Sequence, residues 1–155
     1  MLLRRSFLAA SSAWALALPL AAFAASRPAA SSAVYGFALA VYAAGRLVCH
    51  QLPERSFHLW NASLPVCARC TGIYMAAAVT AIAIAAAGPR RRTEARLVRR
   101  SAKADPRVVL LIACIPTAAT LVFEWTTGVT PANWIRALAG IPLGVAVAWA
   151  VGMVN

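Results

Sequence analysis

Charged residues are scarce in this chain. They make up 12% of its 155 residues, and only four of them are acidic, whereas 62% of the residues are hydrophobic. Soluble domains carry about 25% charged residues, so a fold of this composition has too little polar surface to face water on every side. The scarcity of charge excludes an ordinary soluble domain and predicts that lipid covers part of the protein. The length suits one compact domain.

Charges are nearly absent from four apolar runs of 18 or 19 residues, which are residues 7–25, 71–88, 108–125 and 137–154. This length is close to the ~20 residues that a membrane-crossing helix needs. A fifth run, residues 33–48, would reach only about 24 Å as a helix. The sequence therefore predicts an all-α membrane protein: a bundle of about four transmembrane helices plus one shorter apolar helix before a Cys-His-Gln motif. The scarcity of intramembrane charges argues against a transport pathway.

Most of the positive charge lies in residues 89–107, which carry a net charge of +6. This stretch lies between two apolar runs and has no interleaved aromatic residues, so we do not expect nucleic acid as a partner. It is instead predicted to be a basic cytoplasmic loop that contacts anionic lipid headgroups. Residues 49–66 and 126–133 then lie on the outer face, and Arg4 and Arg5 favour a cytoplasmic N-terminus. A rival topology lets the short apolar run cross as well and places the N-terminus outside.

Residues 1–32 allow two interpretations. The basic Arg4-Arg5 pair, the apolar run after it and Ala22-Phe23-Ala24 resemble a signal peptide, and the string R-R-S-F-L resembles a twin-arginine signal. We favour an uncleaved first membrane helix, because residues 33–155 form a helical membrane domain of their own. The richness in Ala and Arg is typical of a GC-rich bacterial genome. The expected location is therefore the bacterial cytoplasmic (inner) membrane, with several crossings.

Three of the four cysteines and both histidines fall between residues 49 and 70. Two motifs flank a polar loop: Cys49-His50-Gln51 and Cys67-Ala68-Arg69-Cys70. We expect the C-x-x-C pair to open a helix with Pro65 in its first turn, so that the two thiols share a face. A helix N-terminus favours thiolate, which is both a metal ligand and a redox nucleophile. The fourth cysteine, Cys114, is most simply a small buried apolar residue.

Three chemistries compete for these residues. The preferred one is a metal site formed by Cys49, Cys67 and Cys70 with His50 or, in a supporting role, His58; three cysteines and one histidine typically bind zinc, with iron or copper as alternatives. The second is thiol–disulfide exchange by Cys67 and Cys70 as catalytic residues, with Cys49 as a third thiol, which an oxidising outer face would favour. The third is a structural disulfide without chemistry. The metal site requires the three sulfur atoms to lie within roughly 5 Å of one another, with His50 near enough to join them.

Two charged residues at the ends of neighbouring apolar runs, Glu124 and Arg136, could support this site, as could Arg69. The alternative is that Glu124 and Arg136 close a helical hairpin or extend to the lipid headgroups. Gly140 and Gly144 have the spacing that lets helices approach closely. Packing within the bundle explains them most simply, and a homo-oligomer through the same glycines is the further expectation.

The motif residues also resemble a known family. Cys49-His50-Gln51, residues 53–57 and residues 64–74 resemble the signature of the domain of unknown function 2085 (DUF2085) family of small predicted membrane proteins. Residues 124–128 and 133–137, together with Gly140 and Gly144, also resemble its pattern. The resemblance covers about residues 33–150. It implies a multi-helix membrane protein and supports the motif residues as the site, but it supplies no activity.

Overall fold

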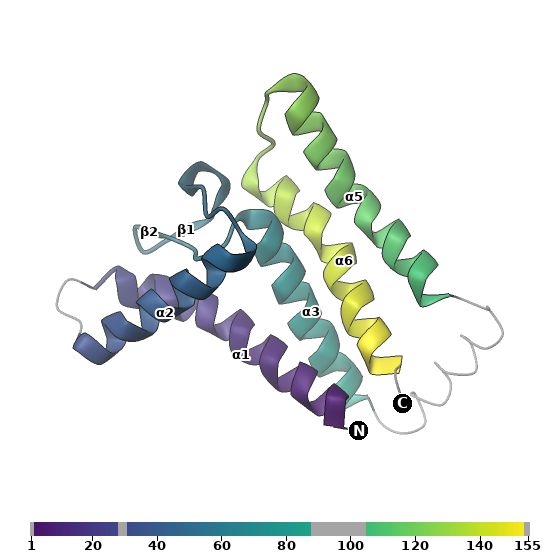
Figure 1. Ribbon diagram of the computed structural model, residues 1–155, viewed down its shortest axis with the longest axis horizontal. Helices are drawn as coiled ribbons and strands as arrows, with labels where there is room; N and C mark the ends of the chain where they lie inside the picture. The colour runs from purple at the N-terminus through teal and green to yellow at the C-terminus, as the bar shows by residue number, and fades with distance from the viewer. Residues whose placement is uncertain (1, 28–30, 88–104, 154–155) are drawn as a thin grey trace.

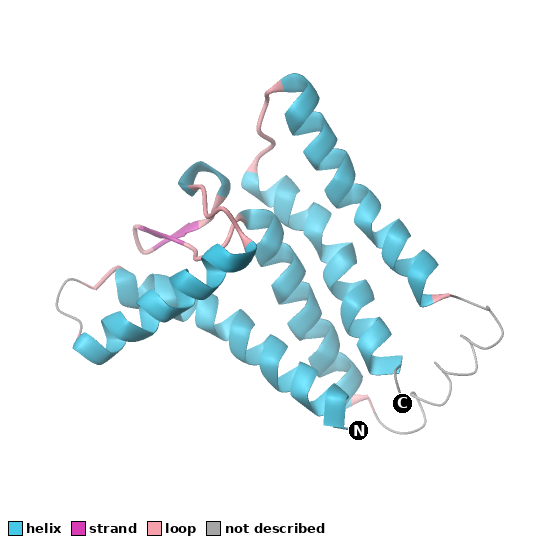
Figure 2. Ribbon diagram, in the orientation of Figure 1, coloured by secondary structure: helices cyan, strands magenta, loops and turns pink. Residues whose placement is uncertain are grey.

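The computed structural model describes residues 2–27, 31–87 and 105–153. In this part of the chain the long elements are α-helices, and their bounds are α1 (Leu2–Ala25), α2 (Ser32–Val48), α3 (Ala68–Ala86), α5 (Pro106–Thr127) and α6 (Asn133–Met153) (Figures 1 and 2). A 3₁₀ turn, η1 (Pro53–Arg55), and an antiparallel hairpin of β1 (His58–Leu59) and β2 (Ala62–Ser63) fill the loop between α2 and α3. The structure confirms the all-α membrane fold and adds this small hairpin, which hydropathy did not reveal.

The ends of α5 show how local sequence sets the helix bounds. Asp105 is the N-cap, and its side chain accepts a hydrogen bond of 2.9 Å from the backbone N–H of Arg107. Pro106 follows at the first helical position, where its missing N–H leaves no hydrogen bond unmade. Gly128 ends the helix at φ +68°, a left-handed conformation that glycine adopts without strain. The helix is therefore two residues longer at each end than its apolar run.

Helices α3 and α6 run parallel and form the centre of the bundle. Gly140 faces the backbone of Arg69, and Gly144 faces the backbone of Ile73, so closely that a Cβ atom at either glycine would collide with a carbonyl oxygen. The predicted close approach at Gly140 and Gly144 is therefore made within one chain. Because α3 covers both glycines, the structure does not support a homo-oligomer through them.

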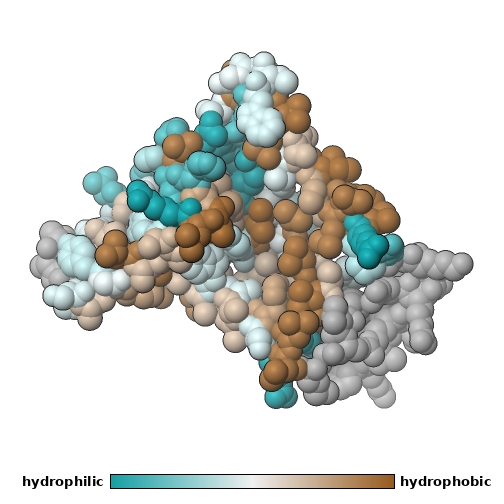
Figure 3. Space-filling view, in the orientation of Figure 1, coloured by the Kyte–Doolittle hydropathy of each residue, from teal (hydrophilic) through white to brown (hydrophobic). Residues whose placement is uncertain are grey.

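Four helices, α1, α3, α5 and α6, are long and apolar enough to cross a membrane, whereas α2 is shorter. Helix α5 shows most clearly that lipid must cover the bundle, since it exposes several large apolar side chains, among them Leu111, which is 70% exposed. The surface of the helices is hydrophobic over a broad area (Figure 3). The protein is thus a membrane protein with several apolar helices, as the composition predicts.

The ends of the helices define two faces. Helices α3 and α6 begin, and α5 ends, at the same end of the bundle, beside the loop that follows α2 (Figure 1). We call this the loop end. The side-chain amide of Asn133 at the start of α6 donates to the carbonyl oxygen of Ser56 in that loop at 3.0 Å. Residues 49–66 and 126–133 therefore share one face, as predicted. Residues 89–104 of the predicted basic loop lie outside the described residues, so the orientation of the bundle stays a prediction.

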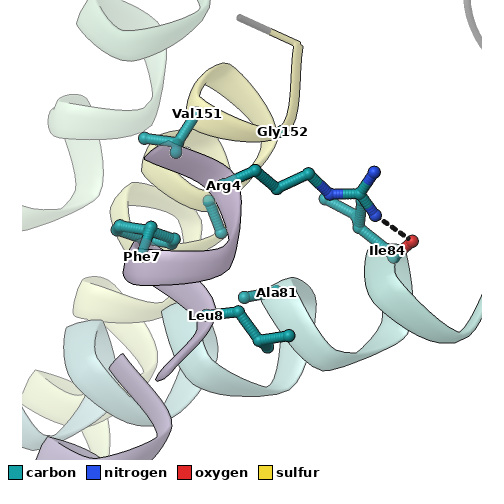
Figure 4. Close-up of a pocket in the computed structure, with 8 residues that line it drawn as sticks. Arg4, Phe7, Leu8, Ala81, Ile84, Val151 and Gly152 are labelled. Atoms are coloured by element: carbon teal, nitrogen blue, oxygen red, sulfur yellow. Dashed lines mark hydrogen bonds between the residues drawn. The ribbon is translucent and has the colours of Figure 1, made fainter. Parts of the chain in front are cut away.

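At the opposite end, α1 begins where α3 and α6 end. The Arg4 guanidinium donates to the carbonyl oxygen of Ile84 at 2.8 Å and satisfies one of the last acceptors of α3 (Figure 4). Phe7 and Leu8 pack on a buried alanine cluster that includes Ala81 of α3. Helix α1 therefore lies antiparallel to α3 as part of the bundle.

Candidate functional site

The two cysteine motifs lie at the loop end, one at the end of α2 and one at the start of α3. Helix α2 ends at Val48, and Cys49 is extended, with φ −149° and ψ 139°. Cys67 is the N-cap of α3, so the helix begins at Ala68. The expectation that Pro65 lies in the first helical turn is wrong: the chain stays non-helical through Pro65, whose carbonyl oxygen accepts a side-chain hydrogen bond.

The sulfur atoms of Cys49, Cys67 and Cys70 lie within 4.8 Å of one another. All three residues are half-buried free thiols, and no disulfide joins them. A buried apolar cluster that includes Val66 and Leu18 packs against Cys49 and Cys70. The convergence of the three cysteines that the spacing predicts is confirmed, and the three sulfur atoms lie together over an apolar floor.

Hydrogen bonding polarises this thiol cluster toward one residue. The backbone N–H of Cys67 donates to the Cys49 sulfur at 3.2 Å. Hydrogen bonds from the thiol of Cys67 and then from that of Cys70 hold the pKa of Cys49 well below its ordinary value, although burial acts in the opposite direction. Hydrogen bonding therefore favours the thiolate form at Cys49, and thiolate is the form that binds metals and attacks disulfides.

Gln51 fixes the position of Cys49 relative to α3. Its backbone has φ +51°, a left-handed conformation, and this turns the side-chain amide back toward α2. The Nε2 group donates to the carbonyl oxygen of Tyr42 at 2.7 Å and to that of Pro65 at 2.5 Å. Gly45 permits this approach, because a Cβ atom there would collide with the Pro65 carbonyl and the Gln51 amide. This role of Gln51 was not predicted from the sequence, although its place directly after Cys49-His50 was the signal.

Neither histidine joins the thiol cluster. Among the described residues, the metal-ligand atoms that lie together there come from the three cysteines alone. His50 is exposed, and so is His58 on β1. The reason is local: Cys49 is extended, and neighbouring residues of an extended chain point to opposite sides. The structure therefore does not bring His50 into the thiol cluster, and its place in a ligand set stays a prediction.

Glu124 and Arg136 form a second polar cluster at the same end of the bundle. Both residues are buried, and Arg136 Nη2 lies 2.7 Å from Glu124 Oε2. Arg69 Nη2 donates to Glu124 Oε1 at 2.8 Å and to Thr120 Oγ1 at 3.0 Å. Arg55 of η1 lies 3.6 Å from Glu124 Oε2. Glu124 and Arg136 therefore close the α5–α6 hairpin, and their burial rules out extension to the lipid headgroups. The contact of Arg55 with Glu124 was not predicted from the sequence.

The two clusters lie on different sides of the first turn of α3. Successive residues of an α-helix point about 100° apart, so Arg69 faces away from its neighbour Cys70. Cys70 packs with Tyr74 against the core beside α1, whereas Arg69 reaches α5. Glu124 and Arg136 therefore do not support the thiol cluster directly. Cys114 lies in the middle of α5, half-buried, and belongs to neither cluster.

Comparison with known proteins identifies the family. The sequence model of a family described as "Predicted membrane protein (DUF2085)" matches residues 49–150, which span both cysteine motifs and α3, α5 and α6. The chain belongs to this family.

Two curated relatives from archaea resemble the chain over shorter segments. "Uncharacterized protein MJ1492" of Methanocaldococcus jannaschii is 50% identical over 36 residues, which are 23% of each chain. An "Uncharacterized protein" of Methanothermobacter thermautotrophicus is 53% identical over 32 residues, 21% of this chain and 29% of the relative. The matched segment thus covers less than a third of either relative. No solved structure matches. Since both relatives are archaeal, the bacterial location stays a prediction.

Proposed function

We propose that Cys49, Cys67 and Cys70 bind a metal ion, zinc first and iron or copper after it, at one face of the membrane. The observation that carries the proposal is the placement of three sulfur atoms within 4.8 Å of one another. A tetrahedral zinc ion binds sulfur at about 2.3 Å, which places the ligand atoms roughly 3.5–4 Å apart. A small contraction of the cluster around an ion therefore suffices.

Three cysteines leave one position of a tetrahedral ion to another ligand. Water, or His58 after a movement of the hairpin, fits this position better than His50, which lies on the other side of the extended chain. A closed four-ligand site is structural and would fasten the loop to α2 and α3. A site with three protein ligands and water in the fourth position is typical of catalytic zinc.

A second candidate function is thiol oxidoreductase. It is favoured by the hydrogen-bonded Cys49 beside the C-x-x-C pair, because a third thiolate within reach can attack a disulfide. Oxidation of Cys67 and Cys70 to a disulfide releases two electrons and two protons, which a membrane quinone would accept. Cys49 would then attack one sulfur of that bond, form a mixed disulfide and release the other cysteine as thiolate.

Metal analysis with thiol counting on the full chain in detergent separates these functions. The metal hypothesis predicts about one zinc per chain and three thiols protected from alkylation, with the metal lost in Cys49→Ser and retained in the matched control Cys114→Ser. The oxidoreductase hypothesis predicts a metal-free protein with a reducible bond between Cys67 and Cys70. A metal-free protein whose bond resists mild reductants would leave a structural disulfide.

The proposed face is the outer one, because the charge of residues 89–107 favours the cytoplasm. A cysteine introduced at Ser101 in a Cys114→Ser background tests this on intact cells. An impermeant maleimide should leave position 101 unlabelled. Labelling there would place the thiol cluster in the reducing cytoplasm, where the oxidoreductase hypothesis loses its oxidising environment and the zinc hypothesis gains support.

A further inference from the structure

The cluster around Glu124 holds more positive charge than negative. Three guanidinium groups, those of Arg136, Arg69 and Arg55, lie 2.7, 2.8 and 3.6 Å from the single carboxylate. Guanidinium groups stay protonated in proteins, so the single carboxylate balances one of the three charges and leaves an excess of two positive charges among these ion pairs. A network made only to close a hairpin would need one arginine.

The other carboxylates of the described part of the chain do not supply the missing charge. Glu54 is exposed in η1, and every ion pair among the described residues ends on Glu124. Asp105 caps the start of α5, at the far end of the helix from Glu124. A buried charge without a partner is strongly unfavourable in a low-dielectric environment. Arg69 and Arg136 are both largely shielded, with side chains 13% and 2% exposed, so one of these two charges lacks a balancing charge among the described residues, and an anion from outside would supply it.

The same arginines have unused hydrogen-bond donors. The Nε groups of Arg55, Arg69 and Arg136 are shielded from solvent, and each lacks a hydrogen-bond partner among the described residues. Arg136 itself is only 2% exposed. Native proteins rarely leave buried donors unpaired, and groups that lack a partner often bind an ion or ordered water. Three such donors around one carboxylate indicate that acceptor oxygens of a ligand belong here.

The cluster becomes more exposed toward η1. The exposed fraction of the side chain rises from 2% at Arg136 through 13% at Arg69 to 37% at Arg55, so an ion would approach the cluster beside η1. Hydrophilic residues gather over this part of the loop end (Figure 3). Arg69 and Arg136 also lie in the first turns of α3 and α6, whose N-terminal dipole ends favour an anion.

We propose that Arg55, Arg69 and Arg136 bind the phosphate group of an anion that enters beside η1 at the loop end. The planar guanidinium fork matches phosphate oxygens in a bidentate manner, and three forks supply both the charge and the donors that a phosphate requires. A free phosphate and the headgroup of an anionic phospholipid share this chemistry. The site is separate from the thiol cluster and does not rest on metal binding there.

Thermal unfolding of the full chain in nanodiscs tests the proposal. In the first arm the protein is in neutral phosphatidylcholine discs, and the unfolding temperature in inorganic phosphate is compared with that in chloride at equal ionic strength. In the second arm the unfolding temperature in neutral discs is compared with that in discs that contain phosphatidic acid. Stabilisation by inorganic phosphate assigns a free anion, and stabilisation by phosphatidic acid alone assigns a lipid headgroup. Arg55→Gln, at the partly exposed entrance, should weaken the response at least tenfold. Arg46→Gln, in the exposed last turn of α2, is the matched control and should respond as the wild type does.

Glu124→Gln separates binding from a purely structural role. Removal of the carboxylate that pairs with the three arginines raises the excess positive charge, so a folded Glu124→Gln protein should bind phosphate more tightly than the wild type, whereas a purely structural network gives no tightening. Absence of a wild-type response to both probes would overturn the proposal. An Arg55→Gln response equal to that of the wild type, or a folded Glu124→Gln protein with weaker binding, would do the same. If Glu124→Gln does not fold, Arg55→Gln decides.

Discussion

Replacement of Gln51 by alanine should loosen the thiol cluster without removing any of its sulfur atoms. The change deletes two hydrogen bonds, those to the carbonyl oxygens of Tyr42 and Pro65, which tie the end of α2 to the segment before α3. Each such bond contributes about 0.5–1.5 kcal/mol, so local opening of the Cys49 segment should become easier by about 1–3 kcal/mol. This corresponds to a roughly 5- to 150-fold increase in the open population.

The rate of Cys49 alkylation by a maleimide reports this opening, with peptide mass spectrometry to assign the label. The metal-free full chain in detergent is the sample, and the matched control is His50→Ala. His50 is exposed and lies outside the thiol cluster, so its removal should leave the alkylation rate unchanged. Equal alkylation rates in Gln51→Ala and the wild type would refute the bracing role. A larger effect from His50→Ala would show that the roles of the two residues are reversed.

Two further predictions concern the bundle and the acidity of the cluster. Gly144→Ala should lower the free energy of unfolding in detergent by about 1–3 kcal/mol, because the added Cβ atom would collide with the Ile73 carbonyl oxygen. The matched control is Gly36→Ala, which has open space around the added Cβ atom and should not destabilise the protein in the same assay. Because hydrogen bonding from Cys67 lowers the pKa of Cys49, thiolate absorbance of the metal-free protein should persist below the ordinary thiol range near pH 8.5, and Cys49→Ser should abolish it. The folding stability linked to this thiolate is fully present above the ordinary thiol pKa and is lost as the pH falls through the lowered pKa of Cys49. Thiolate absorbance that vanishes near pH 8.5 in the wild type would contradict the lowered pKa.

The sequence predicted the thiol cluster because its determinants are local. A C-x-x-C pair at a helix start presents both sulfur atoms together, and the 17 residues between Cys49 and Cys67 give the chain ample reach. The position of His50 depended on a detail that hydropathy does not encode, which is whether the chain after Val48 continues as helix or becomes extended. Since Cys49 is extended, the two neighbouring side chains diverge.

The arginine cluster was only half predictable. Glu124 and Arg136 flank one short turn, so their pairing follows from the hairpin. Arg55 and Arg69 come from distant segments, and their convergence depends on how η1 and α3 pack against the end of α5. Similarly, the G-x-x-x-G spacing of α6 predicted a close helix contact, but the choice of α3 over a second copy is a tertiary outcome that the pattern itself does not contain.

X-ray absorption at the zinc edge tests the central claim most directly, on the full chain purified with zinc in detergent. We predict three sulfur atoms at about 2.3 Å and one lighter atom at about 2.0 Å around the metal. In Cys49→Ser the sulfur shell should shrink or the zinc should be lost, and in Cys114→Ser it should stay the same. A zinc shell of nitrogen and oxygen atoms alone, or no bound zinc at all, would contradict the proposed metal site.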